Sequence, residues 1–188
     1  MNRVQAQIKP EHLIGIRFSL EERRGLAQLL QGGKLRNRRL CVDWLRRGEL
    51  VRGNRAFIFE MCAKLIPDRS EHVRWGAFSI LGEYAQTHPK QLWPLVIKWG
   101  SVPSKDIRDG VACCILEHIF EYHFGEFFAK AMQHASQEPR FAYTIQECHK
   151  FGQASEPGNS ALFDDFAASL KKPREPRGAG RSARASAK

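Results

Sequence analysis

The sequence predicts an all-α protein, and three observations lead to that prediction. Amphipathic segments follow one another along the 188 residues, separated by Gly, Pro and helix-capping Ser residues. Alternating β-branched runs with turn pairs, which would indicate strands, do not occur in the sequence. Two of the helical segments are alike at an offset of 34 residues, a spacing typical of helical-repeat proteins. A chain of this length can bury one core, and we expect a single domain.

Four helices are expected in the first half of the chain. Ser19 and Glu22 form the capping-box pattern ahead of the first helix, and Gly32-Gly33 end it. The next three are expected to end before Gly48, Pro67 and His88-Pro89. The expected ranges are 20–31, 34–47, 53–65 and 70–87, with Ser70 as the cap of the fourth.

The second half continues the same pattern. A helix at 90–100 tolerates Pro94, because a proline in the first turn removes no helical hydrogen bond. Ser104 caps a longer helix, which we expect to break near Gly125. Shorter helices are expected at 125–135, 139–151 and 160–170.

These elements divide the chain into an N-terminal extension (1–18), a helical-repeat domain (19–170) and a C-terminal tail (171–188). The tail consists mainly of Pro, Gly, Ser, Ala and basic residues, without large apolar side chains. Such a composition cannot offset the entropy lost on ordering, so we predict a disordered basic tail.

The net charge of +10 is unevenly distributed along the chain. Residues 1–55 hold 13 Lys or Arg against 5 Asp or Glu, residues 56–170 hold 10 against 14, and residues 171–188 hold 7 against 1. A mildly acidic body is therefore flanked by two basic segments. This asymmetry favours an anionic partner, of which nucleic acid is the commonest kind, although basic surfaces can also serve solubility alone.

The two related helices are SEHVRWGAFSILGEYA, from Ser70, and SKDIRDGVACCILEHI, from Ser104. The corresponding pairs are Ser70 and Ser104, Val73 and Ile107, Arg74 and Arg108, Gly76 and Gly110, Ala77 and Val111, Leu81 and Ile115, and Glu83 and Glu117. A weaker third copy places Phe141, Ile145 and Cys148 at the same offset beyond Ile107, Val111 and Cys114. A repeat of this period indicates stacked helical units.

The stretch PDRSEHVRWGAFSILGEYA resembles HEAT-like repeats of the armadillo-type helical superfamily. In that family an Asp precedes a Val-Arg pair, and apolar residues follow at helical spacing. The positions that carry the resemblance are Asp68, Val73, Arg74, Ala77 and Leu81. The resemblance implies a right-handed α-α superhelix, a HEAT-like solenoid. The second copy has Val102 where the early Asp would fall, so a ladder of Asp–Arg pairs between repeats is not implied.

Adjacent Cys113 and Cys114 stand in the helix after Ser104, followed by His118 and His123. Adjacent helical residues point about 100° apart, and the two histidines are five residues apart, so neither a disulfide nor a shared metal is expected. We interpret the cysteines as small buried side chains. One face of this helix is expected to bury Ile107, Val111, Cys114, Ile115 and His118.

Other residues of catalytic type are also interpreted as structural. Cys148-His149 are neighbours that face different directions, and the sequence offers no orienting Asn or Asp and no oxyanion hole. Glu117 and Glu121 are expected together on a solvated helix face. Because no strand is predicted, no glycine-rich phosphate loop follows one. We therefore expect no catalytic residue, no metal ligand and no cofactor.

The strongest cationic cluster lies between residues 34 and 55. A basic helical surface can hold phosphates, and an exposed aromatic beside it can stack a base. Trp44 is the aromatic in question, although we expect it to pack in the core with Leu35, Leu40 and Leu45. The candidate nucleic-acid-binding residues are Lys34, Arg36, Arg38, Arg39, Arg46, Arg47, Arg52 and Arg55.

These observations predict a non-enzymatic helical-repeat binding or scaffold protein whose partner is another macromolecule, either protein or nucleic acid. Nucleic acid would be contacted through the basic N-terminal helices and the tail. No apolar run approaches the roughly 20 residues that cross a bilayer, and no N-terminal segment suits a secretory signal. The 5 cysteines do not suggest a disulfide framework. We expect a cytoplasmic protein with reduced thiols and no membrane partner.

The alternative function is enzymatic. In architecture and charge the chain is similar to the HEAT-like alkylpurine DNA glycosylases, which are helical solenoids that cradle DNA on a basic concave face. The similarity implies a tryptophan-lined site with a catalytic Asp, usually with Trp and Asp on one helix face. Here Asp43 and Trp44 are adjacent, and the pattern W-x-x-x-D does not occur.

Overall fold

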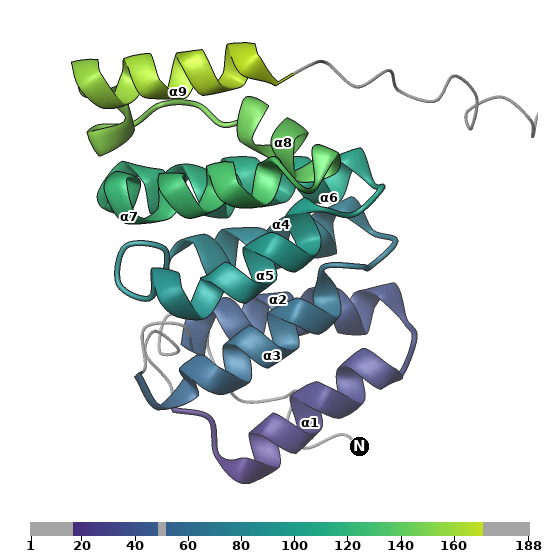
Figure 1. The fold of residues 1–188 in the computed structure, drawn as a ribbon. Coiled ribbons are helices and arrows are strands. Elements are labelled where there is room, and N and C mark those ends of the chain that lie inside the picture. The colour runs from purple at the N-terminus through teal and green to yellow at the C-terminus, as the bar shows by residue number, and fades with distance from the viewer. Residues whose placement is uncertain (1–16, 49–51, 171–188) are drawn as a thin grey trace, which may run out of the picture.

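The protein is all-helical in the computed structural model, which describes residues 17–48 and 52–170 (Figure 1). The α-helices are α1 (Leu20–Gln31), α2 (Leu35–Gly48), α3 (Arg55–Leu65), α4 (Glu71–Gly82), α5 (Pro89–Gly100), α6 (Lys105–Val111), α7 (Glu117–Ala135), α8 (Pro139–Gln146) and α9 (Pro157–Ser169). Short 3-10 segments lie at η2 (Arg52–Asn54) and η4 (Gly152–Ser155), and a π-helical turn, η3 (Ala112–Leu116), joins α6 to α7. The prediction of an all-α protein is confirmed over these residues. The expected extension at 1–18 falls mostly outside them, and the expected tail at 171–188 lies wholly outside.

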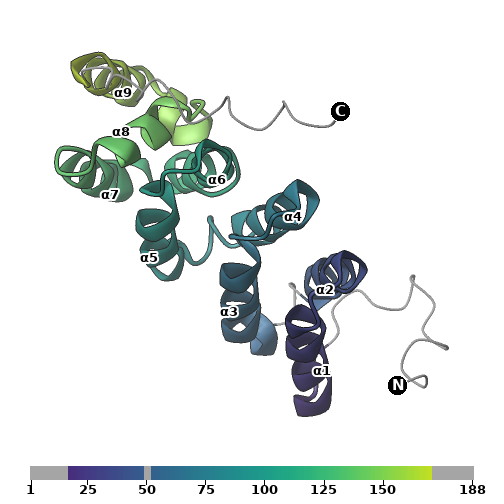
Figure 2. The same ribbon diagram turned by 90° about the vertical axis from the view of Figure 1, so that its right-hand side faces the viewer.

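The helices stack in two layers, with successive helices alternating between them (Figure 2). One layer contains α2, α4 and α6, which pack side by side. The other contains α1, α3 and α5, each of which packs against the next helix in the chain. The buried core lies between the layers, so each helix is left with one outward face.

The start of α1 is held by the predicted capping box. The Glu22 N–H donates to Ser19 Oγ over 3.2 Å, and the Ser19 N–H donates to Glu22 Oε2 over 2.7 Å. Ser70 and Ser104 occupy the predicted N-cap positions of α4 and α6, but their side chains accept no capping hydrogen bond. The sequence therefore predicted where these three helices begin, although the capping hydrogen bonds form only at the first.

Three helix boundaries differ from the expected ranges. The fourth helix ends at Gly82, five residues before Thr87, and α8 ends at Gln146 rather than at 151. The break expected near Gly125 occurs at His123, whose φ of −139° and ψ of 37° are non-helical. His123 Nε2 lies 2.6 Å from the Gln86 carbonyl oxygen, a contact 37 residues away in sequence. Such a contact leaves no local sequence signal.

Two glycines mark where neighbouring helices of the α2–α4–α6 layer come closest. Gly76 of α4 faces Val42 of α2, and Gly110 of α6 faces Phe78 of α4. Both glycines are buried, and an added Cβ would lie 2.5 Å from Val42 Cγ1 or 2.2 Å from Phe78 Cδ2. The pairing of Gly76 with Gly110 from the sequence repeat therefore corresponds to equivalent packing. Val42 of α2 precedes Phe78 of α4 by 36 residues, and each side chain faces a glycine of the next helix in the layer. The packing pattern therefore has a further copy on α2.

Each helix of this layer also carries an arginine near its start that bonds back to the loop before it. Arg74 Nη1 donates to the Asp68 carbonyl over 2.7 Å, and Arg108 Nη1 donates to the Val102 carbonyl over 2.8 Å. Arg38 of α2 donates in the same way to the Gly33 carbonyl. The three arginines thus close the connections before α2, α4 and α6.

Two of these arginines also reach the following copy. Arg38 forms an ion pair with Asp68, and Arg74 binds Asp106 through Nε and Nη2, each 2.5 Å from Oδ2. Asp106 stands in the first turn of α6, four residues beyond Val102, the position where the early Asp would recur. Arg–Asp pairs between copies are therefore present although the aligned position holds valine, because a carboxylate four residues further on reaches the equivalent arginine.

The π turn at η3 corrects two expectations for the helix after Ser104. The Glu117 N–H bonds to the Ala112 carbonyl, five residues back, so one extra residue enters the turn and rotates the residues beyond it. His118, expected in the core, is exposed, and Glu117, expected in solvent, is 5% exposed. Ala112, Leu116 and Ile119 are buried as the neighbouring stripe.

Candidate nucleic-acid interface

The basic segment of the chain forms α2 and the turn before it. Gly33, with a φ of 68°, reverses the chain after α1, and this left-handed conformation favours glycine. Cys41, Val42, Leu45 and Gly48 are the buried residues of α2 and define its inner face. At 3.6 residues per turn, the opposite face contains positions 36, 39, 43, 46 and 47.

Four arginines occupy that outward face, which we call the arginine face: Arg36, Arg39, Arg46 and Arg47. Arg36, Arg39 and Arg46 are exposed and Arg47 is half-buried. None of them forms an ion pair with another residue of the described part of the chain, and neither does exposed Lys34 before the helix. Eleven residues separate the first arginine from the last, which corresponds to roughly 16 Å of helix.

The other three candidate cations lie elsewhere. Arg38 points to the opposite side of α2, where it binds Asp68 and the Gly33 carbonyl. Arg55 opens α3 and contacts His88 Nε2 at the start of α5. The side chain of Arg52 is outside the described part of the structure. The cluster of eight residues in the sequence therefore divides into a solvent-facing group and residues that join helices.

Asp43 and Trp44 affect the charge and the aromatic character of the arginine face. Asp43 is exposed between the arginines and reduces their combined charge from +4 to +3. Trp44 is half-buried and packs against the core, as expected, but Leu35, which was expected beside it, is exposed at the start of α2. The arginine face thus provides cationic side chains for phosphate contacts, but α2 has no fully exposed indole on which a base could stack.

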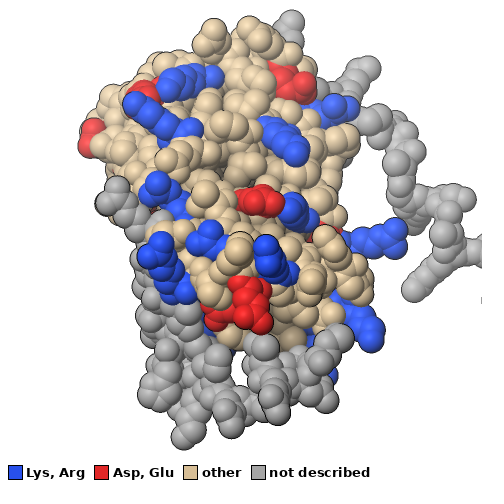
Figure 3. All heavy atoms as spheres, turned by 90° about the horizontal axis from the view of Figure 1, so that it is seen from below, with Lys and Arg blue, Asp and Glu red and all other residues tan. Residues whose placement is uncertain are grey.

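Charge changes sign along the layer. Positions on α4 and α6 that correspond to Arg36 are His72 and Asp106, and those that correspond to Arg39 are Trp75 and Asp109. Figure 3, which views the end of the molecule where α1 lies, shows more Lys and Arg than Asp and Glu on that face. The outward basic surface of this layer is therefore concentrated at its N-terminal end.

A Trp–Asp contact that the sequence did not indicate occurs between α4 and α6. Trp75 Nε1 donates to Asp106 Oδ1 over 3.1 Å, while Arg74 occupies Oδ2. Both carboxylate oxygens of Asp106 are thus engaged by side chains that join two copies of the repeat. The arrangement serves to hold α4 against α6, and the glycosylase-like alternative gains no open Trp–Asp site from it.

The residues of the π turn form a second polar cluster with the end of α8. Glu117 Oε1 accepts the His149 N–H over 2.7 Å and lies 3.0 Å from His149 Nδ1. Cys148 Sγ donates to the Thr144 carbonyl over 3.4 Å. Burial raises the pKa of the Cys148 thiol well above its ordinary value, so the thiol stays protonated. The cluster satisfies buried polar groups where α8 ends.

Three further thiols share this chemistry. Burial raises the pKa of Cys41 to about 12 and that of Cys114 to about 11, and it also raises that of half-buried Cys113. No set of three His, Cys, Asp or Glu side chains within 17–48 and 52–170 is arranged to hold a metal ion. The cysteines that drew attention in the sequence thus pack as neutral side chains.

Comparison of the chain with protein-family models, with curated proteins and with solved structures finds no match. Among the described residues, no helix combines the length and the apolar character needed to cross a bilayer.

Proposed function

We propose that this protein is a HEAT-like helical-repeat binding protein that holds nucleic acid through phosphate contacts from the arginine face of α2. One observation carries the proposal. Four arginines, three of them exposed and Arg47 half-buried, lie on one side of a helix without ion pairs to the described part of the chain. Unpaired guanidinium groups of this kind suit phosphate oxygens, which they bind in bidentate geometry.

The HEAT-like part of the proposal has its own support. Arg38, Arg74 and Arg108 play matching roles in α2, α4 and α6, and Gly76 and Gly110 occupy matching contacts. Units that recur in this way, each packed on its neighbours, are the organisation expected of a solenoid. A solenoid presents one layer of helices as an extended surface, and the arginine face belongs to such a layer.

The same geometry favours the backbone of a nucleic acid over its bases. Sequence-tolerant binding of single strands relies on aromatic stacking, and Trp44 packs against the core. Phosphate contacts alone position a protein without reading sequence. We therefore expect weak, sequence-independent binding to duplex DNA or RNA. With four phosphates neutralised, the slope of log K against log salt should be roughly −3 to −4.

The test is fluorescence anisotropy with a short labelled duplex at several salt concentrations. Changing Arg36, Arg39, Arg46 and Arg47 together to Glu should weaken binding at least tenfold and flatten the salt slope. Lys98→Glu with Arg140→Glu is the matched control, because these exposed cations lie on α5 and α8. Removal of the basic residues 171–188 should lower affinity as well. Circular dichroism of each variant reports whether its helices are retained.

Two results would contradict the proposal. One is the absence of salt-sensitive binding even at low ionic strength. The other is equal binding by the wild type and by the fourfold arginine variant, which would assign the charge to solubility. A parallel reaction with alkylated duplex tests the enzymatic alternative, since release of a free base would establish a glycosylase.

A further inference from the structure

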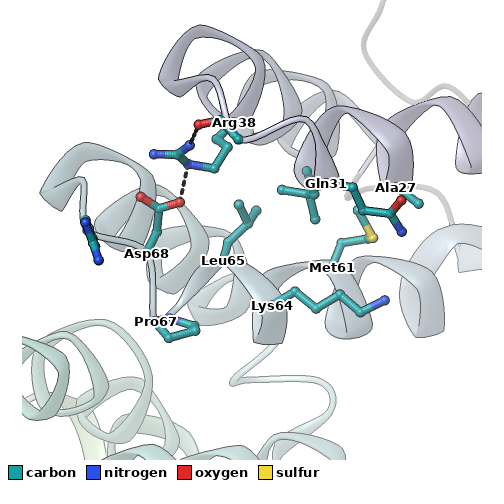
Figure 4. A pocket seen from close by; sticks show the side chains of 11 residues that line it. Ala27, Gln31, Arg38, Met61, Lys64, Leu65, Pro67 and Asp68 are labelled. Atoms are coloured by element: carbon teal, nitrogen blue, oxygen red, sulfur yellow. Dashed lines mark hydrogen bonds and ion pairs between the residues drawn. The ribbon is translucent and has the colours of Figure 1, made fainter.

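A groove lies between α1 and α3, in the layer that does not contain the arginine face. Its volume is about 740 Å³, within the range of ligand-binding clefts. Figure 4 shows Ala27 on the α1 side, Met61 and Leu65 on the α3 side, and Pro67 at one end. Apolar side chains from the two helices thus line the groove together with polar and charged ones.

The groove remains open because α1 buries little of its apolar surface. Leu26 is the one described residue of α1 that is buried, whereas Ala27, Leu29 and Leu30 are half-buried and Leu20 is 66% exposed. By contrast, Met61 and Leu65 on the facing side of α3 are at most 1% exposed. Covering the half-buried residues of α1 would remove further apolar surface from water, which is favourable in proportion to the area.

The charged residues around the groove determine which partner fits. Arg38, Lys64 and Arg69 line it together with one carboxylate, Asp68. Asp68 is already paired with Arg38, so Lys64 and Arg69 remain to attract an anionic group. Lys64 binds Glu60 over 2.6 Å, but both side chains are more than half exposed, and exposed pairs of this type contribute little and exchange readily. Arg69 is exposed and forms no ion pair within the described part of the chain.

We propose that this groove binds an acidic amphipathic helix of a partner protein. The apolar residues of such a helix, spaced i, i+3, i+4 and i+7, would lie along Ala27, Leu30 and Pro67, above the buried Met61, as in other helix-in-groove complexes. Acidic residues on its flanks would pair with Lys64 and Arg69. An apolar floor does not suit a phosphate backbone, so this surface is separate from the arginine face and does not depend on the function proposed for it.

The first experiment uses the wild-type chain and needs no variant. The chain has 3 methionines, of which Met61 lines the groove and half-buried Met132 lies on α7. With [¹³C-methyl]methionine labelling, a synthetic peptide of Leu and Glu residues with one apolar face should shift the Met61 methyl signal saturably. The Met132 signal should stay in place. A peptide of identical composition with the leucines scrambled should bind at least tenfold more weakly.

A second experiment tests the contribution of the charged residues Lys64 and Arg69. Lys64→Glu with Arg69→Glu should weaken binding of the labelled peptide about tenfold or more, because opposite charges are replaced by like charges. Lys90→Glu, at an exposed cation on α5, should leave it within twofold. Lys64 and Arg69 are both exposed, so their substitution is compatible with the fold. Thermal unfolding of the variant verifies this.

Three outcomes would overturn the proposal. The first is peptide binding that leaves the Met61 signal unshifted. The second is equal binding of the amphipathic and scrambled peptides. The third is a Met61 shift that follows protein concentration without peptide, which would mean that a second copy of the chain fills the groove.

Discussion

Two glycines show most directly how single residues control the spacing of the helices. Gly76 and Gly110 lie against Val42 and against the ring of Phe78, whose side chain is fully buried and cannot move aside. In a well-packed interior, one added methyl group displaces neighbours or backbone. The close approach of α2, α4 and α6 therefore depends on the absence of a Cβ at these positions.

Gly76→Ala and Gly110→Ala should each lower the free energy of unfolding by about 1–3 kcal/mol through overpacking. Gly25→Ala is the matched control, since nothing lies within 4 Å of a Cβ there. In the interior of α1 that change should raise stability by about 0.5–1 kcal/mol. Urea unfolding measures all three. Similar effects at the three positions would contradict the packing argument.

The Cys41 thiol links stability to pH. Burial raises its pKa from 9.0 to about 12, so the folded protein keeps the proton where the unfolded chain releases it. The stabilisation is complete below pH 9 and is lost as pH rises towards 12, by up to about 1.4 kcal/mol per pH unit. Cys41→Ala removes this contribution, so its free energy of unfolding should depend less steeply on pH than that of the wild type. Urea unfolding at pH 7, 9 and 10.5 measures the difference, and a constant offset between the proteins would contradict the expectation.

At the scale of elements, the π turn at η3 decides which residues of the α6–α7 segment are buried. Its extra residue brings Glu117 inward to the His149 N–H and turns His118 to solvent. The carbonyl of Cys114 faces Gly82 of α4, where an added Cβ would lie 2.2 Å from the oxygen. The π turn is thus held by contacts on two sides.

Removing one residue from the π turn should be tolerated better than removing one from an ordinary helix. Deletion of Cys113 allows the segment to continue with α-helical hydrogen bonds while the flanking faces keep their directions. Deletion of exposed Ser79 in α4 rotates the buried residues after it by about 100°. We expect the Cys113 deletion to unfold cooperatively on heating, with a free energy of unfolding lower by about 1–3 kcal/mol. The Ser79 deletion should show no cooperative unfolding. Equal damage from both deletions would contradict this interpretation.

The π turn also explains part of the difference between sequence and structure. Helical periodicity predicted the helices, because apolar spacing carries that information. It also predicted that Cys113 and Cys114 are buried, and both are half-buried. It placed Glu117 and His118 incorrectly, since an inserted residue in a turn has no local pattern. The kink at His123 depends on the carbonyl of Gln86 in the turn between α4 and α5, and sequence spacing does not report it.

The candidate interface was predictable to a similar extent. The arginine face follows from the positions of Arg36, Arg39, Arg46 and Arg47 relative to buried Val42 and Leu45. That Arg38 faces inward is also readable from periodicity, but its partner Asp68 lies 30 residues away. The ion pair of Arg74 with Asp106 was missed because the acidic residue lies four positions later in the second copy than in the first. The α1–α3 groove arises from the packing of two helices and has no motif of its own.

At the scale of the whole molecule, packing is densest in the middle of the array and thins towards its ends. α4 buries Val73, Gly76, Ala77, Phe78, Ile80 and Leu81, whereas α1 buries only Leu26 and α9 only Phe163. Each helix contacts mainly its neighbours along the array. In such an arrangement, the end helices can open without disrupting the centre.

Amide hydrogen exchange should therefore show a gradient of protection along the array. Exchange should be fastest in α1 and α9 and slowest in α4 and in the buried part of α7, because opening the centre breaks contacts on both sides. Leu26→Ala should accelerate exchange in α1 while leaving rates in α8 unchanged. Phe78→Ala should accelerate exchange in α4 and α6, since its ring contacts Gly110 of α6. Mass spectrometry of peptides from each helix measures these rates. If α1 and α4 exchanged at one common rate, and Leu26→Ala raised that rate everywhere, the molecule would unfold as a single unit and the array description would fail.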